Sequence, residues 1–453
     1  MEQGTREVRA AIARAHHEQW ARLVAALTRR FGDLDIAEEA AAEAFVTAVE
    51  RWPADGVPPN PGAWLATTAN RKAIDRVRRE NKRDDKQRQA QLLTVDPSEP
   101  LGAVEDDRLR LIFTCCHPAL AIQARVALTL RMVGGLTVPE IARAFLLRAT
   151  AMEQRITRAK AKIKAARIPY RVPSAEDLPG RVRGVLAVLF LVFNEGYLAT
   201  GPDTPPLRQD LTTEAIRLTR LLRALLPDDG EVTGLLALML LTEARRTARV
   251  SASGQLVPLA EQDRGAWDAT LIAEGHRLVR ERLAAGVAPG RYQILAAINA
   301  VHTFARDVRD TDWSQIVALY DQLIRLDPSP VVALNRAIAL AELDGPEVAL
   351  AAVDRLADAL ADYHAYHATR AELLRRIGCD QLAHSAYGRA IELAGNTAET
   401  AYLARRRDEL GQGGTGDGTP RAGNSAGSAS DPGRVVRGEG ERRPHGVAGT
   451  RES

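Results

Sequence analysis

Residues 131–166, "RMVGGLTVPEIARAFLLRATAMEQRITRAKAKIKAA", carry the pattern of two short helices with a turn between them. Thr137 and Thr150 are placed to cap the first turns of the two helices. Apolar residues recur at helical spacing on both sides of the turn: Leu136, Ile141 and Ala142 before it, and Met152, Ile156 and Ala159 after it. This stretch therefore predicts a helix-turn-helix.

Basic residues are concentrated on the second helix of this pair. Residues 143–171 contain nine Lys or Arg and one acidic residue, Glu153, whereas the whole chain has a formal net charge of only +3. A second basic block, residues 70–90, holds nine basic and four acidic residues. One such block alone is explained equally well as a solvent-exposed helix face, but two blocks together favour contacts with a nucleic-acid phosphate backbone. A second helix of this kind lies in the major groove when the motif binds DNA, although similar helix pairs occur in proteins that never touch DNA.

The composition favours an all-α protein. The chain has 453 residues, 45% of them hydrophobic and only 4% aromatic, and it is rich in Ala, Leu and Arg, which suit helices better than strands. Three cysteines cannot form a disulfide framework, and the charged N-terminus is unlike a secretory signal. No uncharged run approaches the length of a membrane span, so we expect a cytoplasmic protein with no membrane association.

The pattern divides the chain into six parts. Residues 1–90 form helices around a Pro- and Gly-rich loop at 53–62, residues 91–105 form a linker, and residues 106–172 contain the helix-turn-helix. A helical extension follows at 173–310. Residues 311–410 repeat weakly, and residues 411–453 are rich in Gly, Ser, Pro and Arg, so we expect them to be disordered.

The repeat has the period of tetratricopeptide units. Three segments align so that small or apolar residues share one column and larger ones share another, with separations of 33 and 34 residues in both. The columns are Ile316, Ala349 and Ala383, and Tyr320, Val353 and Tyr387. Helix pairs with this period stack into a solenoid.

Several motifs, taken in order, resemble a bacterial RNA polymerase sigma factor of the sigma-70 family. "AEEAAAEAF" and "WLATTANRKAIDRVRRE" are similar to region 2 of the extracytoplasmic-function (ECF) subfamily, and the helix-turn-helix is similar to its region 4. "IFTCCHPALA", "IPYRVP" and "VLAVLFLVFNEGYLAT" resemble the ECF group with a long C-terminal extension that ends in tetratricopeptide-like repeats. The chain departs from the family at two places. Ala42 stands where Gln is usual, and residues 69–71 read "ANR" where the family usually has "ARN", so the asparagine is displaced by one residue.

The resemblance implies partners and site residues. Region 2 would bind the β′ subunit of RNA polymerase core and the melted minus-10 promoter strand, with a flipped base in the loop at 53–61. Region 4 would bind the β subunit and the minus-35 duplex. Carboxylates of the acidic helix would face the polymerase: Asp35, Glu38, Glu39 and Glu43. Cations would contact DNA: Arg71, Lys72, Arg76, Arg78, Arg79, Arg148, Arg155, Arg158, Lys160 and Lys162. Trp64 would pack beneath its helix. No cofactor is implied.

"FNEGY" is the one polar interruption of an apolar helix outside these regions. Asn194, Glu195 and Tyr197 are there either for structural reasons, with Gly196 ending the helix, or as a regulatory contact through which the extension masks or braces regions 2 and 4. A protein partner of the repeats is a further possibility that the sequence leaves open.

Other candidate sites are weaker. Cys115, Cys116 and His117 lack the spaced second pair of a closed metal site, and His364 and His367 lack the glutamate of a zinc protease motif, so we expect buried packing for the first set and a surface face for the second. No nucleophile–base pair or phosphate-binding glycine loop is present, and we expect no enzyme activity. Two alternatives to a sigma factor remain: a helix-turn-helix regulator with a helical ligand- or protein-binding domain, and a repeat scaffold whose basic face is incidental.

Overall fold

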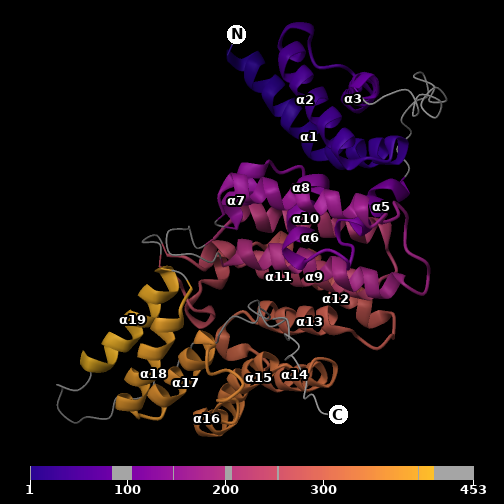
Figure 1. The fold of residues 1–453 in the computed structure, drawn as a ribbon. Coiled ribbons are helices and arrows are strands. Elements are labelled where there is room, and N and C mark those ends of the chain that lie inside the picture. Colours follow the sequence, from indigo (N-terminus) through magenta and orange to yellow (C-terminus); the bar gives the residue numbers. More distant parts are fainter. Residues whose placement is uncertain are drawn as a thin grey trace, which may run out of the picture. The chain divides into compact units, whose positions relative to one another are not determined.

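The computed structural model describes residues 2–83, 105–145, 147–198, 207–251, 255–395 and 397–412. Within these ranges the chain is helical and has no β-strand, only an isolated antiparallel bridge between Val250 and Leu256 (Figure 1). The predicted all-α class is confirmed. The predicted linker at 91–105, apart from Glu105, where a helix begins, and nearly all of the predicted disordered tail at 411–453, lie outside the described residues.

The chain divides into two compact units. The first comprises residues 1–200 and 207–232, and the second comprises residues 201–206 and 233–453. The first unit contains α1 (Glu2–Phe31), α2 (Leu34–Asp55), α3 (Pro61–Arg83), α5 (Glu105–Cys115), α6 (Ile122–Leu128), the π-helical turn η1 (Thr129–Val133), α7 (Val138–Ala144), α8 (Ala149–Ala165), α9 (Leu178–Tyr197) and α10 (Gln209–Leu225).

The first three helices pack on one another through alanine-rich faces. Asp33 caps α2 by accepting hydrogen bonds from the backbone N–H groups of Asp35 and Ile36 at 2.8 and 3.3 Å. Five alanines of α2 are at most 2% exposed, so the neighbouring helices approach it closely. Trp64 packs edge-on against buried Trp52, with ring centroids 5.6 Å apart, beneath α3 as predicted.

The predicted loop at 53–62 is shorter than expected. α2 runs through Pro53 to Asp55 and ends at Gly56, whose φ of 82° reverses the chain, and α3 begins at Pro61. The reason is that a proline in the last turn of a helix removes only one hydrogen bond, and the next turn is closed by the Gly56 N–H bonding to the Trp52 carbonyl at 3.0 Å. The loop between α2 and α3 is therefore residues 56–60.

The predicted helix pair at 131–166 is present as α7 and α8. Thr137 and Glu140 form a capping box: the Thr137 N–H donates to Glu140 Oε2 at 2.7 Å, and the Glu140 N–H donates to Thr137 Oγ1 at 3.4 Å. The prediction for Thr150 was wrong, because α8 begins at Ala149 and its N-cap, which makes no side-chain cap bond, is Arg148, two residues before Thr150.

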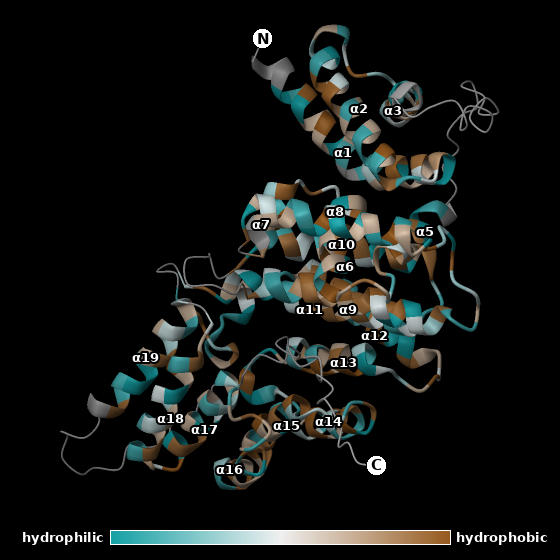
Figure 2. Ribbon diagram, viewed as in Figure 1, coloured by the Kyte–Doolittle hydropathy of each residue, from teal (hydrophilic) through white to brown (hydrophobic). Residues whose placement is uncertain are grey.

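The helices α9 and α10 belong to the same compact unit as α5 to α8, so the division predicted at residue 172 falls inside this unit. Figure 2 shows α9 as largely hydrophobic, and its buried face includes Val182, Val185, Leu186 and Leu189. Arg181 of α9 donates to the Phe113 carbonyl of α5 at 2.5 Å. These two helices therefore pack against α5 and α6, which precede the helix-turn-helix pair, rather than standing apart from them.

The second unit contains most of α11 (Gly230–Glu243), then α12 (Ala269–Ala284), α13 (Arg291–Phe304), α14 (Trp313–Leu326), α15 (Pro330–Leu343), α16 (Pro346–Asp354), α17 (His364–Arg376), α18 (Asp380–Leu393) and α19 (Thr397–Gln412). The aligned columns of the repeat fall on α14, α16 and α18, and all six of their residues are at most 3% exposed. α19 extends two residues beyond the predicted boundary at 410. Across the described ranges no helix is long and apolar enough to cross a membrane.

Candidate nucleic-acid interface

All four carboxylates of α2 that were predicted to face the polymerase form ion pairs with basic side chains. Glu39 and Glu43 face α3, where they form ion pairs with Arg76 and, at 3.4 Å, with Lys72. The two pairs thus join carboxylates predicted to face the polymerase to cations predicted to face DNA. All four side chains are between 29% and 46% exposed, so a partner can still reach them.

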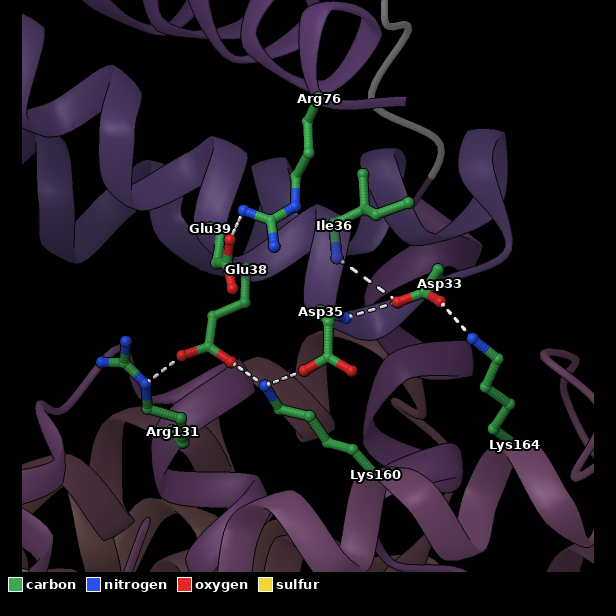
Figure 3. A network of polar contacts seen from close by, with 9 residues as sticks. All are labelled: Asp33, Asp35, Ile36, Glu38, Glu39, Arg76, Arg131, Lys160 and Lys164. Carbon is green, nitrogen blue, oxygen red and sulfur yellow. Dashed lines mark hydrogen bonds and ion pairs between the residues drawn. The ribbon is translucent and has the colours of Figure 1, made fainter. Parts of the chain in front are cut away.

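Asp35 and Glu38 face the helix-turn-helix segment instead. Lys160 of α8 lies between them, and its Nζ is 2.7 Å from Asp35 Oδ1 and also bonds Glu38 Oε2 (Figure 3). The second oxygen of Glu38 accepts a 2.5 Å hydrogen bond from Arg131 Nε of η1. One helical turn further along α8, Lys164 Nζ is 3.1 Å from Asp33 Oδ2.

The central pair of this network is withdrawn from water. The side chains of Glu38 and Lys160 are only 10% and 11% exposed, whereas that of Asp35 is 56% exposed. Burial alone would raise the pKa of Glu38, but the charges of Lys160 and Arg131 hold it below its ordinary value. Burial would likewise lower the pKa of Lys160, but Glu38 and Asp35 raise it. Both groups are therefore charged at neutral pH.

The cations predicted to contact DNA divide into exposed and engaged side chains. On α3, Arg71, Arg78 and Arg79 are exposed, while Lys72 and Arg76 pair with α2. On α8 and at its N-cap, Arg148, Arg158 and Lys162 are exposed and Arg155 is half-buried. Lys160 alone of the predicted set is held in a nearly buried ion pair.

The predicted regulatory residues at the end of α9 are mostly in the core. Glu195 and Tyr197 are 4% and 3% exposed, and Tyr197 stacks on Phe193 with centroids 6.1 Å apart. Gly196 does not end the helix, as the structural interpretation had it, because α9 continues to Tyr197. Gly196 lies where α10 begins: a Cβ there would be 2.6 Å from the Thr212 backbone nitrogen.

The two weaker candidate sites, the cysteine pair with His117 and the pair of histidines on α17, have different outcomes in the structure. Cys115 and Cys116 are buried as expected, and burial raises the pKa of the Cys116 thiol to about 11. The same expectation was wrong for His117, which is only half-buried. The expectation that the pair His364 and His367 would form a surface face was wrong for His364, which is 9% exposed and lies 3.4 Å from Glu399. The described ranges hold no group of three or more His, Cys, Asp or Glu side chains placed to share a metal ion.

Sequence reasoning missed three members of the ion-pair network: Asp33, Arg131 and Lys164. One signal was available, since Arg131 is the single charged residue between Val126 and Leu136 in an otherwise apolar stretch. A charge at such a place needs a partner. Which of the chain's acidic residues supplies that partner depends on contacts between residues 93 positions apart, and the spacing does not encode those.

Three family models match the chain in order. Residues 16–83 match sigma-70 region 2, residues 110–163 match sigma-70 region 4, and residues 181–283 match a family of unknown function. The chain belongs to the sigma-70 family. Region 2 therefore corresponds to α1–α3 and region 4 to α5–α8. The two regions give this sigma-70 protein a sigma-factor-like DNA-binding role in transcription initiation, and they imply binding to RNA polymerase core and promoter DNA.

The extension shares its sequence with a bacterial relative. An uncharacterized protein of Rhizobium meliloti (strain 1021) is 44% identical over 393 residues, which is 85% of this chain and 92% of the relative. A match over this share of the chain extends well beyond the sigma-70 regions and into the C-terminal extension. No solved structure matches the chain.

Proposed function

We propose that this chain is a sigma factor of the ECF subfamily, which binds RNA polymerase core and directs it to a specific set of promoters, and whose C-terminal extension regulates that activity. The observation that carries the proposal is the pairing of the two sigma-70 regions with exposed cations on α3 and α8. A helix-turn-helix regulator that is not a polymerase subunit would have no use for region 2.

Each region has a separate task in this proposal. The exposed Arg158 and Lys162 of α8 would contact the minus-35 duplex, and Arg71, Arg78 and Arg79 of α3 would follow the phosphates of the melted minus-10 strand. The carboxylates of α2 would bind basic side chains of the β′ subunit, and region 4 would also bind the β subunit. The proposed protein has no catalytic activity of its own and works in the cytoplasm, where the polymerase is.

The start of the extension is hydrogen-bonded to region 4. Arg181 of α9 bonds the Phe113 carbonyl, and Arg217 of α10 bonds the Val133 carbonyl at 3.3 Å while forming a bidentate pair with buried Glu214. These bonds support a bracing role for α9 and α10. The later helix pairs, which we propose to be tetratricopeptide-like, would offer a surface for a protein partner.

Reconstitution with purified core polymerase tests the proposal. The full chain should form a stable complex with core and start transcription from a defined site on promoters selected from the genome. Arg158→Ala should reduce initiation without loss of core binding. Arg277→Ala, which removes an exposed arginine from α12, is the matched control and should leave initiation unchanged. Sequence-specific DNA binding without any binding to core would instead identify an ordinary regulator.

A further inference from the structure

Region 4 occupies part of the surface that region 2 is proposed to offer to the polymerase. Three cations of region 4, Arg131, Lys160 and Lys164, bond three carboxylates at the start of α2, Asp33, Asp35 and Glu38 (Figure 3). We call these six residues the latch. Two of its carboxylates belong to the proposed polymerase-binding set, and Lys160 belongs to the proposed DNA-binding set.

These contacts exclude the proposed ones. The Lys160 ammonium is already bonded to Asp35 and Glu38 and is 11% exposed, so it cannot also reach a phosphate. Glu38 has one oxygen on Lys160 and the other on Arg131, so neither is available to a basic side chain of another protein. Lys160 and Lys164 lie one turn apart on the same side of α8, so a single movement of this helix would release both.

Close packing beside the latch makes it more than a set of surface ion pairs. Trp20 of α1 donates from Nε1 to the Arg131 carbonyl at 3.1 Å, and the Arg131 guanidinium lies over the Trp20 ring at 5.6 Å. Gly135, with a φ of 77°, passes so close to α1 that a Cβ would be 2.8 Å from the His16 ring. The hydroxyl of Tyr170, which follows α8 in the chain, lies 2.9 Å from the carbonyl oxygens of both Ala25 and Asp107, and the two share its one proton.

We propose that the latch is an autoinhibitory contact: in the free protein α8 covers the acidic surface of α2, and binding to RNA polymerase core requires the latch to open. This inference rests on the proposed function. The displacing partner must present clustered Lys or Arg side chains to α2, because the latch shows that this surface accepts ammonium and guanidinium groups. Promoter DNA then takes up the released cations of α8.

The test uses a double variant that weakens the latch without changing any residue assigned to polymerase or DNA binding. Asp33→Asn keeps an N-cap residue for α2 but removes the charge that holds Lys164. Arg131→Met keeps an unbranched side chain against Trp20 but removes one of the two cations on Glu38. Asp321→Asn with Arg336→Met is the matched control, since that pair, 2.6 Å apart, joins α14 to α15 in the second unit.

Two measurements read out the latch. A zero-length carbodiimide reagent joins a lysine to a carboxylate only where the two are in contact, so the free full chain should give a peptide linking Lys160 to Asp35, and core polymerase should abolish it. The double variant should lose most of this cross-link and bind core on the order of tenfold more tightly. The control variant should match the wild type in both.

Three outcomes would overturn the inference. Absence of the Lys160–Asp35 cross-link in the free chain would mean that the latch is not formed. A cross-link that persists in the complex with core, or a double variant that binds core no more tightly, would mean that the contact does not mask the surface. If no variant binds core although the cross-link forms, the proposed function fails and the masking with it, while the contact between α2 and α8 stands.

Discussion

Replacing Gly196 by Ala should destabilise the first unit, although alanine is the better helix former. Gly196 is inside α9, where Ala would ordinarily gain about 1 kcal/mol. Here the new Cβ would be 2.6 Å from the Thr212 nitrogen and 2.8 Å from the Arg208 carbonyl oxygen. Both are backbone atoms at the start of α10, so no side-chain rotation relieves the clash.

The magnitude follows from the contacts that must move. Overpacking of this kind costs about 1–3 kcal/mol, and separating α9 from α10 also weakens the 2.7 Å hydrogen bond from the Arg208 N–H to the Gly196 carbonyl, worth about 1 kcal/mol. After the gain in helix propensity, the net loss is about 1–3 kcal/mol. For a unit of this size that lowers the melting temperature by roughly 2–12 °C.

Gly180→Ala on the same helix is the control. A Cβ there meets nothing closer than the end of the Arg183 side chain at 3.7 Å, so Ala should raise the melting temperature by a few degrees through helix propensity alone. Differential scanning calorimetry of the full chain compares the two variants, with the second unit as an internal reference. A Gly196→Ala protein that melts at or above the wild-type temperature would refute the packing argument.

Three further predictions concern the interface and its support. Arg158→Ala should weaken binding to promoter duplex by about 1–3 kcal/mol if the arginine contacts a guanine. An equal loss of affinity for all DNA sequences, with a smaller salt dependence, would instead indicate a phosphate contact, and fluorescence anisotropy distinguishes the two. Truncation after Arg171 should give an aggregation-prone protein, because it uncovers apolar surface of α5 and α6, and truncation after Asp229 should stay monomeric by size-exclusion chromatography. The lowered pKa of Glu38 means that its contribution to the latch is present above its ordinary value of 4.5 and is lost as pH falls through the folded value. The raised pKa of Lys160 means that its contribution is present below 10.5 and is lost as pH rises through the folded value. The Lys160–Asp35 contact should therefore be insensitive to pH between these limits and sensitive to salt, and a change near pH 7 in NMR spectra of the lysine side chains would contradict this.

The sequence predicted those parts of the fold that depend on local pattern. Apolar spacing located the helix pair of region 4, and Thr137 caps the first of these helices as predicted, through a capping box with Glu140 that the structure reveals. Two local expectations failed for different reasons. α2 continues through Pro53 because a proline in the last turn of a helix removes only one hydrogen bond. Gly196 is needed for the tertiary approach of α10 rather than for ending a helix. The site was predictable as a set of charges but not as pairs, because Lys160 meets Asp35 and Glu38 only through contacts between residues 125 and 122 positions apart.

The division of charge on α8 explains why both the structural and the functional interpretation of its basic residues can hold. Lys160 and Lys164 occupy one side and neutralise α2, while Arg158 and Lys162 on another side stay in solvent. A nearly buried Lys–Glu pair gives little net stability, because desolvation offsets most of the attraction, but removing one partner leaves the other charge unpaired. Such a contact is therefore specific without being tight. In the proposed opening, a partner that offers Glu38 new cations, and DNA that offers Lys160 new anions, would replace these ion pairs at small cost in free energy, and the remaining cost of opening lies in the packing of Trp20 and Gly135 beside the latch.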